Sequence, residues 1–230
     1  MIISEKSWSA YLERLRRVND KAASLISQYI QQHDITTKDG HTALLEYVEA
    51  VVGKYSEGAA EAACQMYDAI AEASGKVLPA AEPAPTPTFG DVAKTLNGTM
   101  KHVTDPDGIG ASCARLVKRT GVDTTMQNAI RDGAEWAWVP HGDTCGFCLM
   151  LASNGWQKAS KKALKGGHAE HIHPNCDCTY AIRFDGKSNV AGYDPDALYE
   201  QYVVAGETRD ERMRNMQKEY RAASPLKNRL

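Results

Sequence analysis

Apolar side chains recur every three or four residues through the first third of the chain, and charged side chains fill the positions between them. This spacing places the apolar residues on one face of a helix. It predicts a helix from about Ser7 to Gln32, a turn over residues 36–40 and a second helix that ends near Gly75. We expect the two helices to pack as a long N-terminal helical hairpin over residues 1–76, a packing or assembly element.

The pattern changes between residues 77 and 90, where four prolines stand among alanine and threonine. Proline fixes φ and has no amide proton to donate. Residues 77–90 are therefore predicted to be an extended, semi-rigid linker, followed by a second domain over residues 91–206.

Helical spacing resumes after the prolines. Two short helices are predicted, over Phe89–His102 and Ile109–Thr120, with a turn between them. A third helix is expected to end near Arg131, and the short oxygen-bearing side chains of residues 123–125 are its predicted N-terminal cap.

Two segments farther along the chain have the alternating pattern of β-strands, over Glu135–Pro140 and Cys178–Phe184. Helical spacing returns at Asp194, and residues 207–230 form a basic tail that is expected to be an exposed helix with a frayed end. The predicted fold is mainly α, with a small α+β C-terminal domain.

Composition narrows the choice of function. The 230 residues carry a formal net charge of -2, so no overall field attracts the chain to nucleic acid or to an anionic membrane, and any such binding has to be local. No window approaches the roughly 20 apolar residues that cross a bilayer, and the first six residues lack the apolar core of a secretory signal. We expect no membrane anchor and synthesis in the cytoplasm.

Four of the six cysteines fall between residues 145 and 178. In a reducing compartment such clustering points to a metal before a disulfide. Cys145-Gly-Phe-Cys148 has the spacing of half a zinc site, and Gly146 permits the tight turn between the two thiolates. Three candidates for the other half flank the Pro-Asn turn at residues 174–175: His173, Cys176 and Cys178.

A structural zinc ion with three cysteine ligands and one histidine ligand is the favoured interpretation, because four protein ligands leave no open position for water. Either Cys176 or Cys178 completes the set, and His171 is an alternative ligand or a supporting group. Two other interpretations stay open: buried reduced thiols, and a disulfide or redox pair between Cys145 and Cys148.

Two weaker features have a structural and a functional interpretation. Trp136 and Trp138 are expected to form a packing face of a small sheet, with an aromatic platform for bases or sugars as the alternative. A lysine run in the loop between the two half-sites is expected to be solvated, with contact to phosphate, such as that of packaged DNA, as the alternative. The run comprises Lys158, Lys161, Lys162 and Lys165.

Trp138, Asp143-Thr-Cys-Gly-Phe-Cys148 and His173-Pro-Asn-Cys-Asp-Cys178 together resemble the C-terminal domain of the phage Mu F-like minor head proteins, over about residues 115–185. The resemblance implies a minor capsid or head-morphogenesis protein, made in the cytoplasm of a host bacterium. Such a protein is associated with the portal or the head interior of the virion. Portal, capsid or scaffold proteins are its implied partners, and its implied roles are assembly and DNA delivery.

Two alternatives to an assembly protein remain. Glu170-His-Ile-His-Pro174 is similar to the Asp-His-Ile-x-Pro element of HNH endonucleases, in which a histidine activates water and a metal steadies the phosphate. The lysine run and the basic tail suggest a zinc-dependent DNA-binding module, whose affinity would fall steeply with salt. The favoured interpretation is not an enzyme, and the nuclease is the leading enzymatic alternative.

Overall fold

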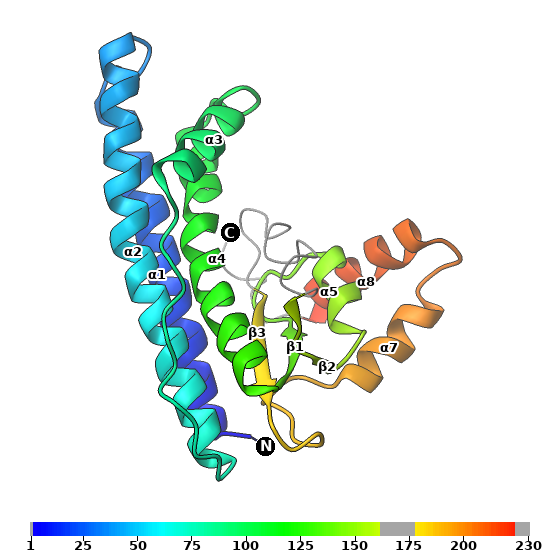
Figure 1. Cartoon of the computed structure of the whole chain (residues 1–230). Helices are drawn as coiled ribbons and strands as arrows, with labels where there is room; N and C mark the ends of the chain where they lie inside the picture. The colour runs from blue at the N-terminus through cyan, green and yellow to red at the C-terminus, as the bar shows by residue number, and fades with distance from the viewer. Residues whose placement is uncertain (1, 162–177, 224–230) are drawn as a thin grey trace.

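The computed structural model describes residues 2–161 and 178–223. Helices α1 (Glu5–Gln32), α2 (Lys38–Ala73) and α4 (Pro106–Asp132) run side by side along one side of the molecule (Figure 1). The shorter α3 (Phe89–Met100) packs against α2 and α4. We call α1–α4 the helical bundle; it holds most of the helical residues of the described chain, which is mainly α as predicted.

Hydroxyl side chains start the first two helices, and a glycine brings α4 close to α1. Ser4 Oγ accepts a hydrogen bond from the Ser7 amide at 3.1 Å, and Thr37 caps α2 in the same way. Gly110 of α4 lies against α1, where an added Cβ would stand 2.5 Å from the Ala23 carbonyl oxygen. The predicted hairpin therefore does not stand alone, because a helix from beyond the prolines packs along it.

Helix α4 is continuous where the sequence predicts two helices, so the predicted cap at residues 123–125 is wrong. The hydroxyl groups of Thr124 and Thr125, predicted to cap a new helix, and that of Thr120 before them instead donate to carbonyl oxygens one turn earlier in the same helix. These bonds join Thr120 to Leu116 at 3.1 Å, Thr124 to Thr120 at 2.8 Å and Thr125 to Gly121 at 3.2 Å. A threonine satisfied in this way does not interrupt a helix.

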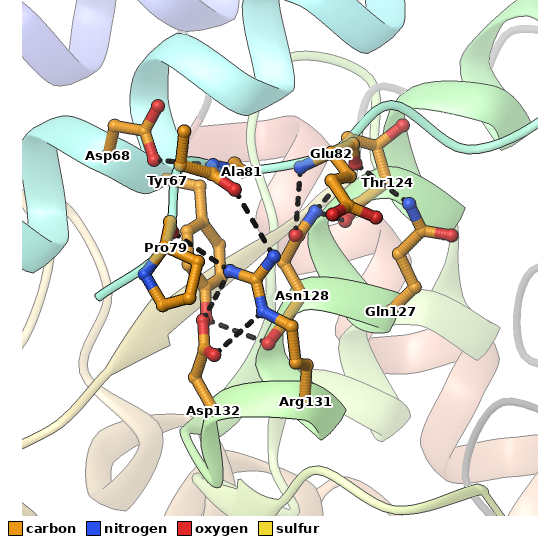
Figure 2. A network of polar contacts seen from close by, with 11 residues as sticks. Tyr67, Asp68, Pro79, Ala81, Glu82, Thr124, Gln127, Asn128, Arg131 and Asp132 are labelled. Atoms are coloured by element: carbon orange, nitrogen blue, oxygen red, sulfur yellow. Dashed lines mark hydrogen bonds and ion pairs between the residues drawn. The ribbon is translucent and has the colours of Figure 1, made fainter.

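Residues 77–88, which we call the strap, are extended and lie along α2 and α4 (Figure 2). Side chains of α4 hold its backbone: Asn128 Oδ1 accepts from the Glu82 amide at 3.0 Å, Thr124 Oγ1 accepts from the Ala84 amide at 2.9 Å, and Arg131 donates to the carbonyl oxygens of Pro79 and Ala80 at 3.1 and 3.2 Å. Two amides between the prolines thus find partners on α4, and a third, that of Ala81, donates to Asp68 of α2 at 2.8 Å. The segment is fixed to the bundle and does not act as a spacer between separate bodies.

A small antiparallel sheet lies beside the bundle, with strand order β2-β1-β3. Strand β1 (Glu135–Val139) pairs with β3 (Thr179–Arg183), with Ala137 opposite Ala181, and these are the two strands that the sequence predicts. The third strand, β2 (Gln157–Lys158), has two residues and was not predicted, because so short a segment shows no alternation.

One hydrophobic core joins the sheet to the bundle. Trp136 and Trp138 of β1 are buried in it together with Trp8 of α1 and Tyr67 of α2. The prediction that the two β1 tryptophans pack in a core, and do not form a binding platform, is confirmed.

Three more helices lie on the side of the sheet away from the long helices: α5 (Gly146–Ala152), α7 (Pro195–Val204) and α8 (Arg209–Ala223) (Figure 1). Helix α5 was not predicted. Helix α8 packs against α5, so the tail is not simply an exposed helix. Over the described residues, none of the helices is long and apolar enough to pass through a bilayer.

Candidate metal centre

The described part of the chain brings three of the clustered cysteines to the junction of α5 and β3. Cys145 is the N-cap of α5, Cys148 lies in the first turn of that helix, and Cys178 immediately precedes β3. The Cys148 amide donates to Cys145 Sγ at 3.4 Å. Because β3 pairs with β1 and α5 follows β1, residues 30 positions apart meet here.

The sulfur atoms of Cys148 and Cys178 lie 3.3 Å apart. A disulfide would place them about 2.04 Å apart. Two thiolates on one tetrahedral zinc would stand about 3.8 Å apart, given Zn–S bonds of about 2.3 Å. The observed pair is therefore not a disulfide: the Cys178 thiol donates a hydrogen bond to Cys148 Sγ, and a shift of about half an ångström would bring the two sulfur atoms to the zinc spacing. It is also a different pair from the Cys145–Cys148 disulfide that the sequence leaves open.

The surroundings of this pair are apolar and exclude water. Cys148 and Cys178 are 2% and 1% exposed, and both belong to the core that contains Trp138 and Tyr180. Burial, reinforced by nearby acidic groups including both of these thiols, raises the pKa of Tyr180 well above its usual value. Tyr180 therefore stays a neutral phenol within this core.

Helix α8 closes over the Cys-x2-Cys segment. Its backbone approaches so closely that a Cβ on Gly146 would lie 2.1 Å from the Met213 carbonyl oxygen. Arg221 forms an ion pair with Asp143 at 2.8 Å, and Arg209 stands over the Phe147 ring. The role predicted for Gly146 is corrected here: it begins an ordinary helical turn, and its missing side chain makes room for α8.

The other candidate residues divide between the described and the undescribed parts of the chain. Lys158 lies in β2 and Lys161 follows it, and both are exposed. The remaining candidates lie outside the described residues: Lys162, Lys165, His171, His173 and Cys176. Within residues 2–161 and 178–223, no three His, Cys, Asp or Glu side chains are arranged as a metal site.

Sequence reasoning missed the residues that brace this centre. Asp143 and Arg221 are 78 positions apart, and nothing in the local pattern of either pairs them. The sequence predicts a tight turn at Gly146, whereas in the structure the missing side chain of Gly146 makes room for α8. Only the packing of α8 on α5 shows what these side chains do.

A second polar centre lies at the far end of α4 and holds the strap (Figure 2). The Tyr67 hydroxyl donates to Asp132 at 2.8 Å. Burial is the main cause that raises the pKa of Tyr67, and this hydrogen bond is the second. Hydrogen bonds from Arg131 lower the pKa of Asp132. Arg131 and Asp132 thus form an ion pair beside the neutral phenol of Tyr67, and Arg131 holds the strap through its carbonyl oxygens.

A family model described as VG15 protein matches residues 2–205, which run from the start of the chain to the end of α7. Searches of curated proteins and of solved structures found no match. Helix α8, which covers the cysteine segment, lies beyond the matched range. The match spans most of the chain, and the protein therefore belongs to the VG15 family, a family of phage gene proteins.

Proposed function

We propose that this phage protein is a minor capsid or head-morphogenesis protein whose C-terminal part is held together by one structural zinc ion. The observation that carries the proposal is the contact between the sulfur atoms of Cys148 and Cys178, with Cys145 at the N-cap of the same helix. Membership of a phage family supports it, as does the resemblance of the cysteine and histidine motifs to the Mu F-like minor head proteins.

The proposed ligand set starts from the one sulfur contact between Cys148 and Cys178. The contact between Cys148 and Cys178 favours Cys178 over Cys176 as the third thiolate, with His173 as the fourth ligand. A zinc ion held in this way cross-links α5 to β3 and stabilises a module whose strands are only two to five residues long. All four positions are filled by protein, so the ion supplies folding energy and no activated water.

The helical bundle supplies the assembly surface in this proposal. Helix α2 has 36 residues and α1 has 28, so together they present a long, stiff face to a portal, capsid or scaffold protein. The location proposed is the head interior or the portal-proximal part of the virion. Packaged DNA is a second partner, which the lysines at 158, 161, 162 and 165 would contact through phosphate.

Elemental mass spectrometry of the purified full-length chain tests the zinc site. We expect about one zinc per chain, lost in Cys148→Ser together with thermal stability. Cys113→Ser is the matched control, because Cys113 is just as buried but lies in α4 within the helical bundle. Absence of metal after reducing purification, or zinc retained in Cys148→Ser, would contradict the site.

Quantitative mass spectrometry of purified phage particles tests the role in the head. We expect the protein in virions at a low copy number, comparable with that of the portal. A phage lacking the gene should give defective heads that the wild-type gene restores. Absence from virions, with normal heads in the deletion, would contradict the proposal.

A nuclease assay separates the enzymatic alternative. In the assembly proposal, the purified protein with Mg²⁺ leaves supercoiled plasmid intact. Cleavage that disappears in His171→Ala, with zinc content unchanged, would establish the HNH-like alternative instead.

A further inference from the structure

Helix α7 carries an apolar face that nothing in the described chain covers. Tyr199, Val203 and Val204 are 57%, 44% and 83% exposed, and α7 has no fully buried side chain. Asp196, Tyr199, Glu200 and Val203 follow one another at steps of three, one and three positions along α7. Residues three or four positions apart share a side of a helix, so the two acidic residues lie on the same side as the two apolar ones. The face is therefore both apolar and acidic.

Helix α8 has a shallow hollow of the opposite character, about 560 Å³ in volume. Three cationic side chains line it together with a glutamine and an alanine: Arg214, Gln217, Lys218, Arg221 and Ala222. The aliphatic stems of arginine and lysine give such a hollow an apolar floor beneath its charged rim. Two of the three acidic residues of α8, Asp210 and Glu211, lie in its first turn, away from the hollow.

The two surfaces complement each other but are not joined within one chain. Inside the chain, α7 and α8 meet through other side chains, with Arg212 over the ring of Tyr202 at 5.2 Å. Both helices lie on the side of the molecule opposite α1 and α2 (Figure 1), and the side chains of Tyr199, Arg214 and Lys218 are exposed.

We propose that two copies of this chain associate through these helices, with the acidic and apolar face of α7 seated in the basic hollow of α8 of the other copy. A two-fold axis repeats the contact, because α8 of the first copy receives α7 of the second. The proposal requires neither the zinc site nor the role in the head.

A second copy fits the hollow better than nucleic acid does. Asp196 and Glu200 of the adjoining α7 would repel a phosphate backbone that followed the arm formed by the two helices. The exposed side chains of Tyr199 and Val203 can pack on the apolar floor of the hollow, whereas a nucleic-acid duplex has no such apolar side chains. A helix pair is also small beside a standard interface, so we expect a weak dimer with a micromolar dissociation constant.

Sedimentation velocity of the full chain over a range of micromolar concentrations tests the proposal. We expect a concentration-dependent change from one chain to two. Reversing the α7 charges with Asp196→Lys and Glu200→Lys should weaken association about tenfold or more, because the two-fold axis repeats each change. Reversing the α8 charges with Arg214→Glu and Lys218→Glu should weaken it to a similar extent. Arg221 is left intact because it pairs with Asp143.

The combined variant with all four reversals is the decisive one. It restores the opposite charges across the contact, so the dissociation constant should return to within about threefold of the wild-type value. Val203→Asp should abolish the dimer, whereas Val77→Asp, at a fully exposed position in the strap, should leave it unchanged.

Three results would overturn the proposal: a chain that is monomeric at every concentration, a dimer that the single-helix reversals do not weaken, or a combined variant that fails to recover. A wild-type monomer that binds short duplex DNA, and loses this binding in the α8 reversal, would assign the hollow to nucleic acid instead. Circular dichroism of each variant separates loss of association from loss of folding.

Discussion

The helical bundle and the region around Cys148 are stabilised by different interactions. In the bundle, helices of 27 to 36 residues bury continuous apolar faces against one another, and the contacts repeat along their length. The region around Cys148, which we call the cysteine module, comprises β1, β2, β3, α5 and α8. Its strands have two to five residues and α5 has seven, too few to build a core of their own.

The cysteine module therefore depends on a few particular contacts. The sulfur pair of Cys148 and Cys178, the approach of α8 to Gly146 and the ion pair of Asp143 with Arg221 each join segments far apart in the sequence. The sheet also shares a hydrophobic core with the bundle, but α5 and α8 have few other contacts, so we expect the loss of one contact to weigh more in the module than in the bundle. The comparison predicts unequal responses to perturbation.

Removal of metal should produce the largest effect. Structural zinc contributes roughly 10 kcal/mol or more to small zinc domains. Adding a strong chelator should therefore expose the amides of β1, α5 and β3 to hydrogen exchange, while the buried amides of α1 and α2 stay protected. Hydrogen-exchange mass spectrometry measures both regions in one sample. Equal loss of protection in the two regions would show that they do not differ as argued.

A methyl group added between α1 and α4 should give the next largest effect. Gly110→Ala would place Cβ 2.5 Å from the Ala23 carbonyl oxygen, so the two backbones must move apart. We expect a loss of about 1–3 kcal/mol in the free energy of unfolding, measured by urea denaturation. Gly53→Ala is the control, because Gly53 lies within α2 with nothing near its added Cβ and should be stabilised by up to about 1 kcal/mol.

The same substitution in the cysteine module should act locally. Gly146→Ala would place Cβ 2.1 Å from the Met213 carbonyl oxygen, and α8 can yield by separating from α5. We expect faster hydrogen exchange in α8 with a smaller change in global stability, of about 1 kcal/mol. A global loss as large as that of Gly110→Ala, with α8 still protected, would show that α8 is as firmly integrated as α4.

The difference between the two regions also explains what the sequence predicts well. Helices α1 and α2 are predicted nearly to their ends, because periodic burial over many turns leaves a repeated signal. Helix α5 and strand β2 are too short to show periodicity. The break predicted within α4 failed because the bonds of Thr124 and Thr125 inside the helix are invisible in the sequence.

The cysteine spacing predicts that the Cys145-x2-Cys148 pair meets residues near positions 173–178, and in the structure Cys178 contacts Cys148. The bound metal stays a prediction. The contacts of α8 with Gly146 and Asp143 could not be foreseen, because they arise from a helix that arrives more than 60 positions later. Spacing reveals ligands that act together, but not the packing that braces them.

The smallest predicted effect concerns a surface turn after β3, outside both regions. Hydrogen bonds from the Ser188 hydroxyl and amide lower the pKa of Asp185 to about 2. A depressed pKa means that the folded state favours the charged form, so the stabilisation is present above the unfolded value near 4 and is lost as the pH falls from about 4 to about 2. Solvent screening at this exposed site limits it to roughly a few tenths of a kcal/mol. Urea denaturation of wild type and Asp185→Asn should differ at pH 6 and converge near pH 2, and Ser188→Ala should give a smaller difference over the same range. Curves that stay parallel throughout would show that the turn does not contribute through this charge.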